Sequence, residues 1–95
     1  METVTKSRPL IAVIVISQEG DEKTVTINTH QKCKQLLQEG LRALYGTPGP
    51  NPDEYDLVFN GIVVEPLDKT IEEAGIADQS SISILPKTIS RGGRN

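Results

Sequence analysis

Four stretches of the chain have the apolar pattern of β-strands. Residues 10–16 are a run of seven apolar, mostly β-branched side chains, which is typical of a strand. Residues 24–27 and 81–85 alternate polar and apolar side chains, which predicts strands that each bury one face. Residues 56–59 predict another strand. In each of the four, alternate residues are therefore expected to face a common core.

Two turns are predicted to join these strands into hairpins. A polar stretch at residues 17–23, which contains a glycine, separates the first two strands and predicts a β-hairpin. Asn60-Gly61 follows the third strand, and this dipeptide is the most favoured one for a two-residue hairpin turn. A short return strand is therefore expected at residues 62–64.

A helix is predicted between the second and third strands, because apolar residues recur there at helical spacing. Asn28 is the expected N-cap, with Gln31 as its capping-box partner, and Gly46 stands where a C-cap is expected. Gly40 inside the helix would allow close packing on a sheet. The apolar stripe consists of Cys33, Leu36, Leu37, Leu41 and Leu44.

The remaining segments define the ends of the domain. Residues 47–54 contain three prolines and predict a loop, and Thr70 with Glu73 predicts a capping box that opens a very short helix. The polar residues 1–9 and the glycine-bearing residues 87–95 predict a flexible arm and a flexible tail. Residues 10–86 then form one two-layer α+β domain, whose strand order the pattern leaves open.

Composition excludes several classes of protein. The 95 residues include one cysteine and one histidine, which excludes a disulfide scaffold and a cysteine-built metal site. The net charge of −3 argues against nonspecific nucleic-acid binding. No apolar run approaches the roughly 18 residues of a membrane span, and no signal-peptide pattern is present. We therefore expect a cytoplasmic monomer that binds no membrane, metal or cofactor.

Three motifs in order resemble the ubiquitin family. They are residues 56–61 (DLVFNG), residues 65–71 (EPLDKTI) and the terminal Arg91-Gly92-Gly93. The resemblance extends from about residue 11 to residue 93. It implies a ubiquitin-like β-grasp fold, in which a mixed sheet packs on one helix and its first and last strands are adjacent, parallel and central.

The resemblance also implies a function as a protein modifier. An activating enzyme, which itself binds the ATP, would adenylate the carboxylate of Gly93 and transfer it to a cysteine as a thioester. A conjugating enzyme would then join it to a lysine of a target protein. Gly92 would fit where enzymes approach the backbone closely, and Arg91 and Lys87 would contribute to recognition of the tail.

The chain departs from ubiquitin after its second glycine, because Arg94 and Asn95 follow Gly93. We therefore expect a precursor that a Gly-Gly-specific peptidase cuts between Gly93 and Arg94, and a zinc metallopeptidase is one candidate class. The loop at residues 47–54 is also longer than in ubiquitin and rich in proline. A bacterial conjugation operon and a divergent eukaryotic modifier both stay open as the source.

Strand alternation predicts a recognition patch on the open face of the sheet. This patch consists of Ile14, Ile16, Val58, Ser83 and Leu85. By the resemblance, Val58 and Leu85 fall at two positions of ubiquitin's hydrophobic recognition patch, and Ser83 replaces the histidine of that patch. Two alternatives stay open: surface aliphatics are common without function, and residues 1–9 would also be able to cover the patch.

Two other functions are compatible with this sequence. A sulfur carrier on the same fold would form a thiocarboxylate at its C-terminal glycine, and a noncovalent ubiquitin-like module would use its surface alone. Catalysis by the chain itself is not expected. Cys33 is predicted to be a buried structural thiol and His30 an exposed residue at the helix start. Asp53, Glu54 and Asp56 are predicted to be solvated loop acids rather than calcium ligands.

Overall fold

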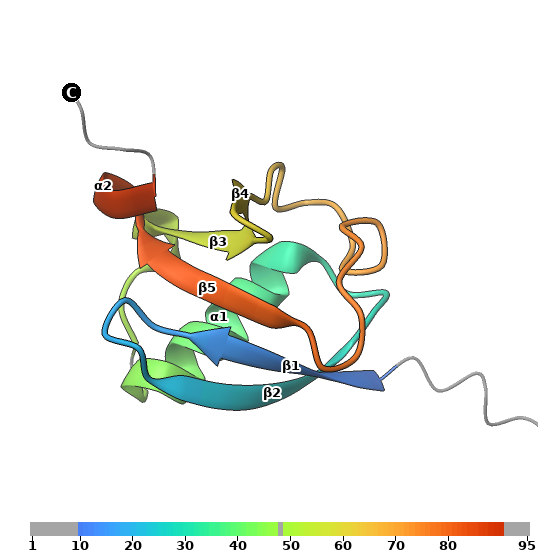
Figure 1. Cartoon of the computed structure of the whole chain (residues 1–95), viewed down its shortest axis with the longest axis horizontal. Coiled ribbons are helices and arrows are strands. Elements are labelled where there is room, and N and C mark those ends of the chain that lie inside the picture. The colour runs from blue at the N-terminus through green and yellow to red at the C-terminus, as the bar shows by residue number, and fades with distance from the viewer. Residues whose placement is uncertain (1–9, 48, 91–95) are drawn as a thin grey trace, which may run out of the picture.

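The computed structural model describes residues 10–47 and 49–90, which form a five-stranded mixed sheet with the order β2-β1-β5-β3-β4 (Figure 1). The strands are β1 (Leu10–Ile16), β2 (Glu22–Asn28), β3 (Tyr55–Phe59), β4 (Ile62–Val63) and β5 (Ser81–Pro86). β1 and β5 are parallel at the centre, and every other pair is antiparallel. The α+β β-grasp architecture is thus confirmed. Residues 1–9 and 91–95, to which the sequence assigns an arm and a tail end, lie outside the described residues.

Both predicted hairpins form, and their turns use the expected residues. Asn60 and Gly61 have φ angles of 56° and 79°, which are the positive values that a type I′ turn requires at both central positions. Between β1 and β2, the buried Ser17 organises the turn, because its Oγ accepts hydrogen bonds from the backbone N–H groups of Glu19 and Asp21 at 3.2 and 3.1 Å.

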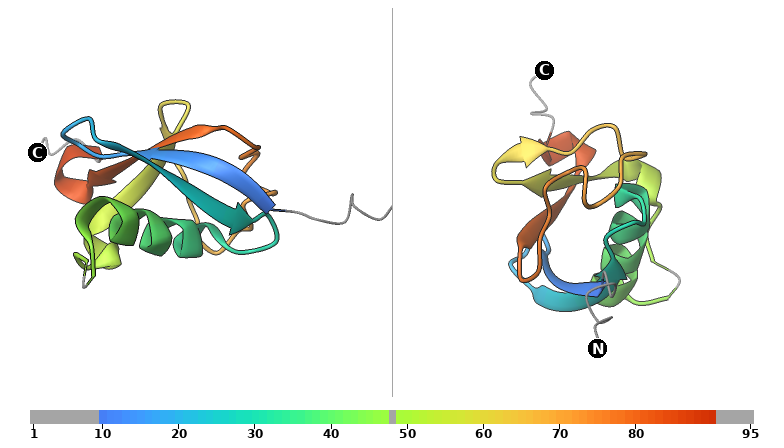
Figure 2. Two further views of the ribbon diagram at one scale, coloured as in Figure 1. Left: turned by 90° about the horizontal axis from the view of Figure 1, so that it is seen from below. Right: turned by 90° about the vertical axis from the view of Figure 1, so that its right-hand side faces the viewer.

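Helix α1 (Cys33–Tyr45) covers one face of the sheet (Figure 2). Its predicted apolar stripe is buried, except that Leu44 is only partly covered. Gly46 ends the helix with a φ of 88°, and its N–H donates to the Arg42 carbonyl. These features confirm the predicted helix face and C-cap.

The predicted start of α1 is wrong, because the helix begins five residues after Asn28. Asn28 is the last residue of β2 and pairs with Leu10, so its backbone belongs to the sheet. Its side chain closes a turn by accepting from the N–H of His30 at 2.8 Å, and the backbone N–H of Asn28 donates to Gln31 Oε1 at 3.2 Å. The predicted contact between Asn28 and Gln31 thus forms, but it does not start the helix. The first N–H groups of α1, those of Cys33 and Lys34, donate to carbonyls of residues 69 and 67 at 2.9 and 3.0 Å. A neighbouring loop thus replaces a side-chain cap.

The predicted capping box at Thr70 forms, but no helix follows it. The Thr70 N–H donates to Glu73 Oε1 at 2.9 Å, and the Glu73 N–H donates to Thr70 Oγ1 at 3.0 Å. The next residues form a turn that ends at Gly75. The N–H groups of Ile71 and Glu72 donate to carbonyls of residues 31 and 29, so they fasten this turn to the segment before α1.

The core between α1 and the sheet is aliphatic, as expected for a sequence with few aromatic residues. The central strands contribute their inward-facing residues, and the turn after Thr70 closes one end with Ile71 and Ile76. The buried hydrophobic residues are Val13, Val15, Val25, Ile27, Cys33, Leu36, Leu37, Leu41, Leu57, Val64, Ile71, Ile76, Ile82 and Ile84.

The chain continues from β5 directly into a single helical turn, α2 (Lys87–Ser90). The sequence predicts a flexible tail from residue 87, whereas in the structure these four residues are folded beside β3 and β5. Ser90 is hydrogen-bonded to the buried Asp56 of β3 at 2.6 Å. Residues 87–90 therefore form a helical turn beside the sheet.

Gly40 faces the central strands β1 and β5 at close range. A Cβ at this position would overlap with Ile84 Cδ1 and lie 3.2 Å from Val15 Cγ1. Gly40→Ala gains about 1 kcal/mol of helix propensity, but overpacking a filled core costs about 1–3 kcal/mol. We expect a net loss of about 1 kcal/mol in the free energy of unfolding, measured by urea denaturation.

The matched variant Gly40→Ala/Ile84→Val removes the atom with which the new methyl group overlaps. In a double-mutant cycle the two substitutions should be coupled, so that the pair is more stable than the sum of the single changes predicts. Additive effects would show that Ile84 does not limit the helix–sheet distance.

Candidate functional site

The open face of the sheet, opposite α1, carries the predicted recognition patch. In the strand register, Ser83 of β5 pairs with Ile16 of β1 on one side and with Val58 of β3 on the other. Val58 in turn pairs with Val63 of β4. Because directly paired residues point to the same face, these four side chains form one continuous row across four strands.

The other two predicted residues lie on either side of this row. Ile14 is two residues before Ile16 and pairs with Ser81, and Leu85 is two residues after Ser83 and pairs with Asp56. Because Ile14 lies beside Ser81, it is offset from Leu85 by four residues of β5, which is about 13 Å along the strand. The fold brings the predicted set onto one face, and the row through Ser83 forms its compact centre. Val63 also belongs to that centre, although the strand pattern in the sequence did not predict which face it occupies.

The aliphatic side chains of the patch are half-buried rather than exposed as predicted. Neighbouring side chains of a five-stranded sheet cover one another's flanks, so that mainly the tips remain accessible. The large hydrophobic side chains with the highest exposure among the described residues lie elsewhere. They are Leu10, Tyr45, Ile62 and Ile89. An interface on the open face would thus present tips of aliphatic side chains around one serine hydroxyl.

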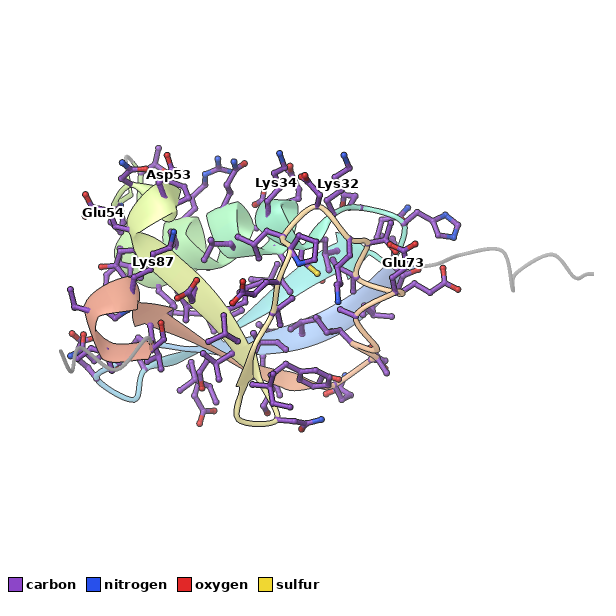
Figure 3. The ribbon with its side chains drawn as sticks, turned by 90° about the horizontal axis from the view of Figure 1, so that it is seen from above. Lys32, Lys34, Asp53, Glu54, Glu73 and Lys87 are labelled. Atoms are coloured by element: carbon purple, nitrogen blue, oxygen red, sulfur yellow. The ribbon has the colours of Figure 1, made fainter. Side chains whose placement is uncertain are left out.

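Lys87 lies at the end of the domain from which the tail continues. It lines a groove of about 300 Å³ between α2 and the 3-10 helix η2 (Pro52–Glu54). Asp53 and Glu54 line the same groove, and Figure 3 shows the three charged residues at one end of the molecule, with Glu73 at the other. The other predicted tail residues lie outside the described residues: Arg91, Gly92, Gly93 and Arg94. The predicted conjugation and processing sites therefore stay predictions.

The prediction that Asp56 is a solvated acid is wrong. Asp53 and Glu54 are exposed in η2, but Asp56 is only 2% exposed and lies inside β3. Its Oδ2 accepts a hydrogen bond from Ser90 Oγ at 2.6 Å. Alternation alone places residue 56 on the open face with Val58, so no sequence signal marks it as buried. In the structure, α2 lies beside β3 and its Ser90 contacts this carboxylate.

Cys33 and His30 lie where the sequence predicts. Cys33 is fully buried in the first turn of α1, where its Sγ is 3.7 Å from the Thr70 carbonyl oxygen. Burial raises the pKa of this thiol, and the Glu73 carboxylate adds to the increase, while Lys69 opposes it. His30 is exposed, with Nε2 3.6 Å from Glu72 Oε1.

Residues 10–47 and 49–90 hold no group of three or more histidine, cysteine or acidic side chains that would bind a metal ion. In the same residues, no helix has the length and apolar character needed to cross a membrane.

The buried Cys33 thiol should be unreactive in the folded protein. Because a raised pKa lowers the thiolate fraction near pH 8 and burial blocks access, a thiol reagent should label native protein at least about a hundredfold more slowly than urea-unfolded protein. Mass spectrometry over time measures both rates. Rapid labelling of the native protein would contradict the burial of Cys33.

Val58→Asp should leave the protein folded, because this side chain reaches solvent on the open face. The matched substitution one residue earlier, Leu57→Asp, places a charge in the core and should unfold the domain. Circular dichroism and thermal unfolding of the two variants test the assignment of the two sheet faces. Unfolding of the Val58 variant as well would show that the open face is covered in the intact chain.

No protein-family model and no curated protein sequence matches the chain. Among solved structures, a de novo design based on ubiquitin superposes with a TM-score of 0.70 at 20% identity, over 84% of this chain and 92% of that one. The ubiquitin-like domain of Arabidopsis thaliana protein At2g32350, solved by NMR, gives a TM-score of 0.68 at 23% identity, over 87% of this chain and 83% of that one. The chain thus has a ubiquitin-like β-grasp fold.

Proposed function

We propose that this protein is a ubiquitin-like modifier, matured by proteolysis between Gly93 and Arg94 and then attached through Gly93 to lysines of target proteins. One observation carries the proposal. In a ubiquitin-like fold, the central strand β5 leads into α2, and Arg91-Gly92-Gly93 follows Ser90 directly in the sequence.

The chemistry takes place at the carboxylate that cleavage would expose on Gly93. This carboxylate attacks the α-phosphorus of ATP held by an activating enzyme, and pyrophosphate leaves. A cysteine thiolate of that enzyme displaces AMP and forms a thioester, which passes to the cysteine of a conjugating enzyme. The amine of a target lysine then attacks the thioester carbonyl, which gives an isopeptide bond and frees the thiol.

The domain supports this chemistry by supplying surfaces for docking. The row from Ile16 through Ser83 and Val58 to Val63 offers aliphatic tips around a hydroxyl group, a composition that suits a small protein interface. Lys87, beside the acidic residues of η2, lies at the tail root, where an enzyme that holds the tail would contact the domain. Because the activating step consumes ATP, the proposed location of the protein is the cytoplasm.

The experiment that tests the proposal uses the full-length chain with an N-terminal tag in its native host. Under denaturing purification, the wild type should carry covalent adducts on larger proteins, and deletion of Gly93 should remove them. Asn95→Ala, which changes only the segment that cleavage would release, is the matched control and should behave as the wild type. Mass spectrometry should find Gly93 joined to the lysine amine, without Arg94 and Asn95.

Other outcomes identify the competing functions. A sulfur carrier would show no adducts and would gain the mass of an oxygen-to-sulfur exchange at Gly93. A noncovalent module would retain its partners and its phenotype when residues 91–95 are deleted. Persistence of Arg94 and Asn95 on all conjugated material would contradict the proposed maturation.

A further inference from the structure

Helix α2 is too short to be stable by itself. It has four residues, none of them buried, and three of its side chains are exposed, with Ile89 at 51%. Isolated helices shorter than about 12 residues are marginal in water. The fold of α2 therefore depends on its contacts with the neighbouring strands rather than on its own backbone hydrogen bonds.

Helix α2 is joined to β3 by the hydrogen bond from Ser90 Oγ to Asp56 Oδ2. The bond length of 2.6 Å lies at the short end of the normal range for a hydroxyl that donates to an oxygen atom. Asp56 is almost fully buried and is fixed in β3 opposite Leu85 of β5. The bond thus joins the end of α2 to a rigid point on the strand beside it.

We infer that Asp56 is a positioning residue for the C-terminal tail, which through Ser90 keeps α2 folded and restricts the reach of Gly93. This inference rests on the proposed function. With α2 docked, the segment from Ser90 to Gly93 spans at most about 10–11 Å; with α2 released, the segment from Pro86 to Gly93 spans about 23–25 Å. Release of α2 thus lengthens the free part of the tail, which then begins after Pro86 instead of after Ser90.

The docked state of α2 should slow the enzymes that act on the tail. An enzyme that threads the tail through a narrow channel needs it extended, and a helical turn about 10 Å wide does not fit such a channel. The enzyme therefore acts on the fraction of molecules in which α2 is released, and its apparent affinity falls with that fraction. The contact between Ser90 and Asp56 acts as a brake on maturation and conjugation.

The first experiment tests the contact by NMR on the full-length protein, through Cα secondary shifts and heteronuclear NOEs of residues 87–90. Ser90→Ala should lose the helical shifts, although alanine is the better helix former, because α2 then loses its hydrogen bond to β3. Thr88→Ala raises helix propensity in the same turn without touching the contact, so it should keep them. Ser90→Thr restores a hydroxyl and should recover the helical turn.

The second experiment measures the use of the tail in the native host. After a labelling pulse, intact mass follows the loss of Arg94 and Asn95 from the tagged full-length chain. Ser90→Ala should speed this loss up to about tenfold, the effect of removing one typical hydrogen bond, whereas Thr88→Ala should match the wild type. Asp56→Asn weakens the contact from outside the tail and should also accelerate maturation, which separates the brake from direct protease contacts with Ser90.

The outcomes separate this inference from the proposed function. Helical shifts that persist in Ser90→Ala would overturn the role of the contact, whatever the chain does in the cell. A released α2 with unchanged or slower maturation would overturn the brake. If the wild type itself shows no processing or conjugation that depends on Gly93, the proposed function and the brake both fail, while NMR still decides whether Asp56 holds α2.

Discussion

The parallel pairing of β1 with β5 is the constraint on which the rest of the structure depends. These strands are far apart in the sequence, and their inward-facing residues, Val13, Val15, Ile82 and Ile84, are all completely buried. Helix α1 lies over them at Gly40, where even a methyl group would meet Ile84 and Val15. Close helix–sheet packing here compensates for the small number of aromatic side chains, because a dense aliphatic core retains its dispersion contacts.

Backbone groups at the start of α1 and just before it form hydrogen bonds with the connection between β4 and β5. The N–H groups at the start of α1 donate to carbonyls of residues 67 and 69, and those of Ile71 and Glu72 donate back to carbonyls of residues 31 and 29. This exchange fastens the long connection between β4 and β5 onto the helix, which allows β5 to enter the middle of the sheet.

The two candidate functional regions both follow from the position of β5. On the open face, Ser83 stands between Ile16 and Val58, so a partner would meet residues from three strands at once. At the end of β5, the chain passes into α2, which Asp56 holds through Ser90. Both candidate regions therefore depend on β5, because Ser83 lies within this strand and α2 begins where the strand ends.

The sequence by itself determined the strands, the helix face, the Asn60-Gly61 turn and the capping box at Thr70, because each depends on side chains a few residues apart. The resemblance to the ubiquitin family predicted the strand order, and strand alternation predicted which residues lie on the open face. Only the tertiary structure decided the start of α1, because pairing with Leu10 holds Asn28 in the sheet. It also decided the burial of Asp56, because a carboxylate in an alternating strand is covered only when a distant segment folds beside it.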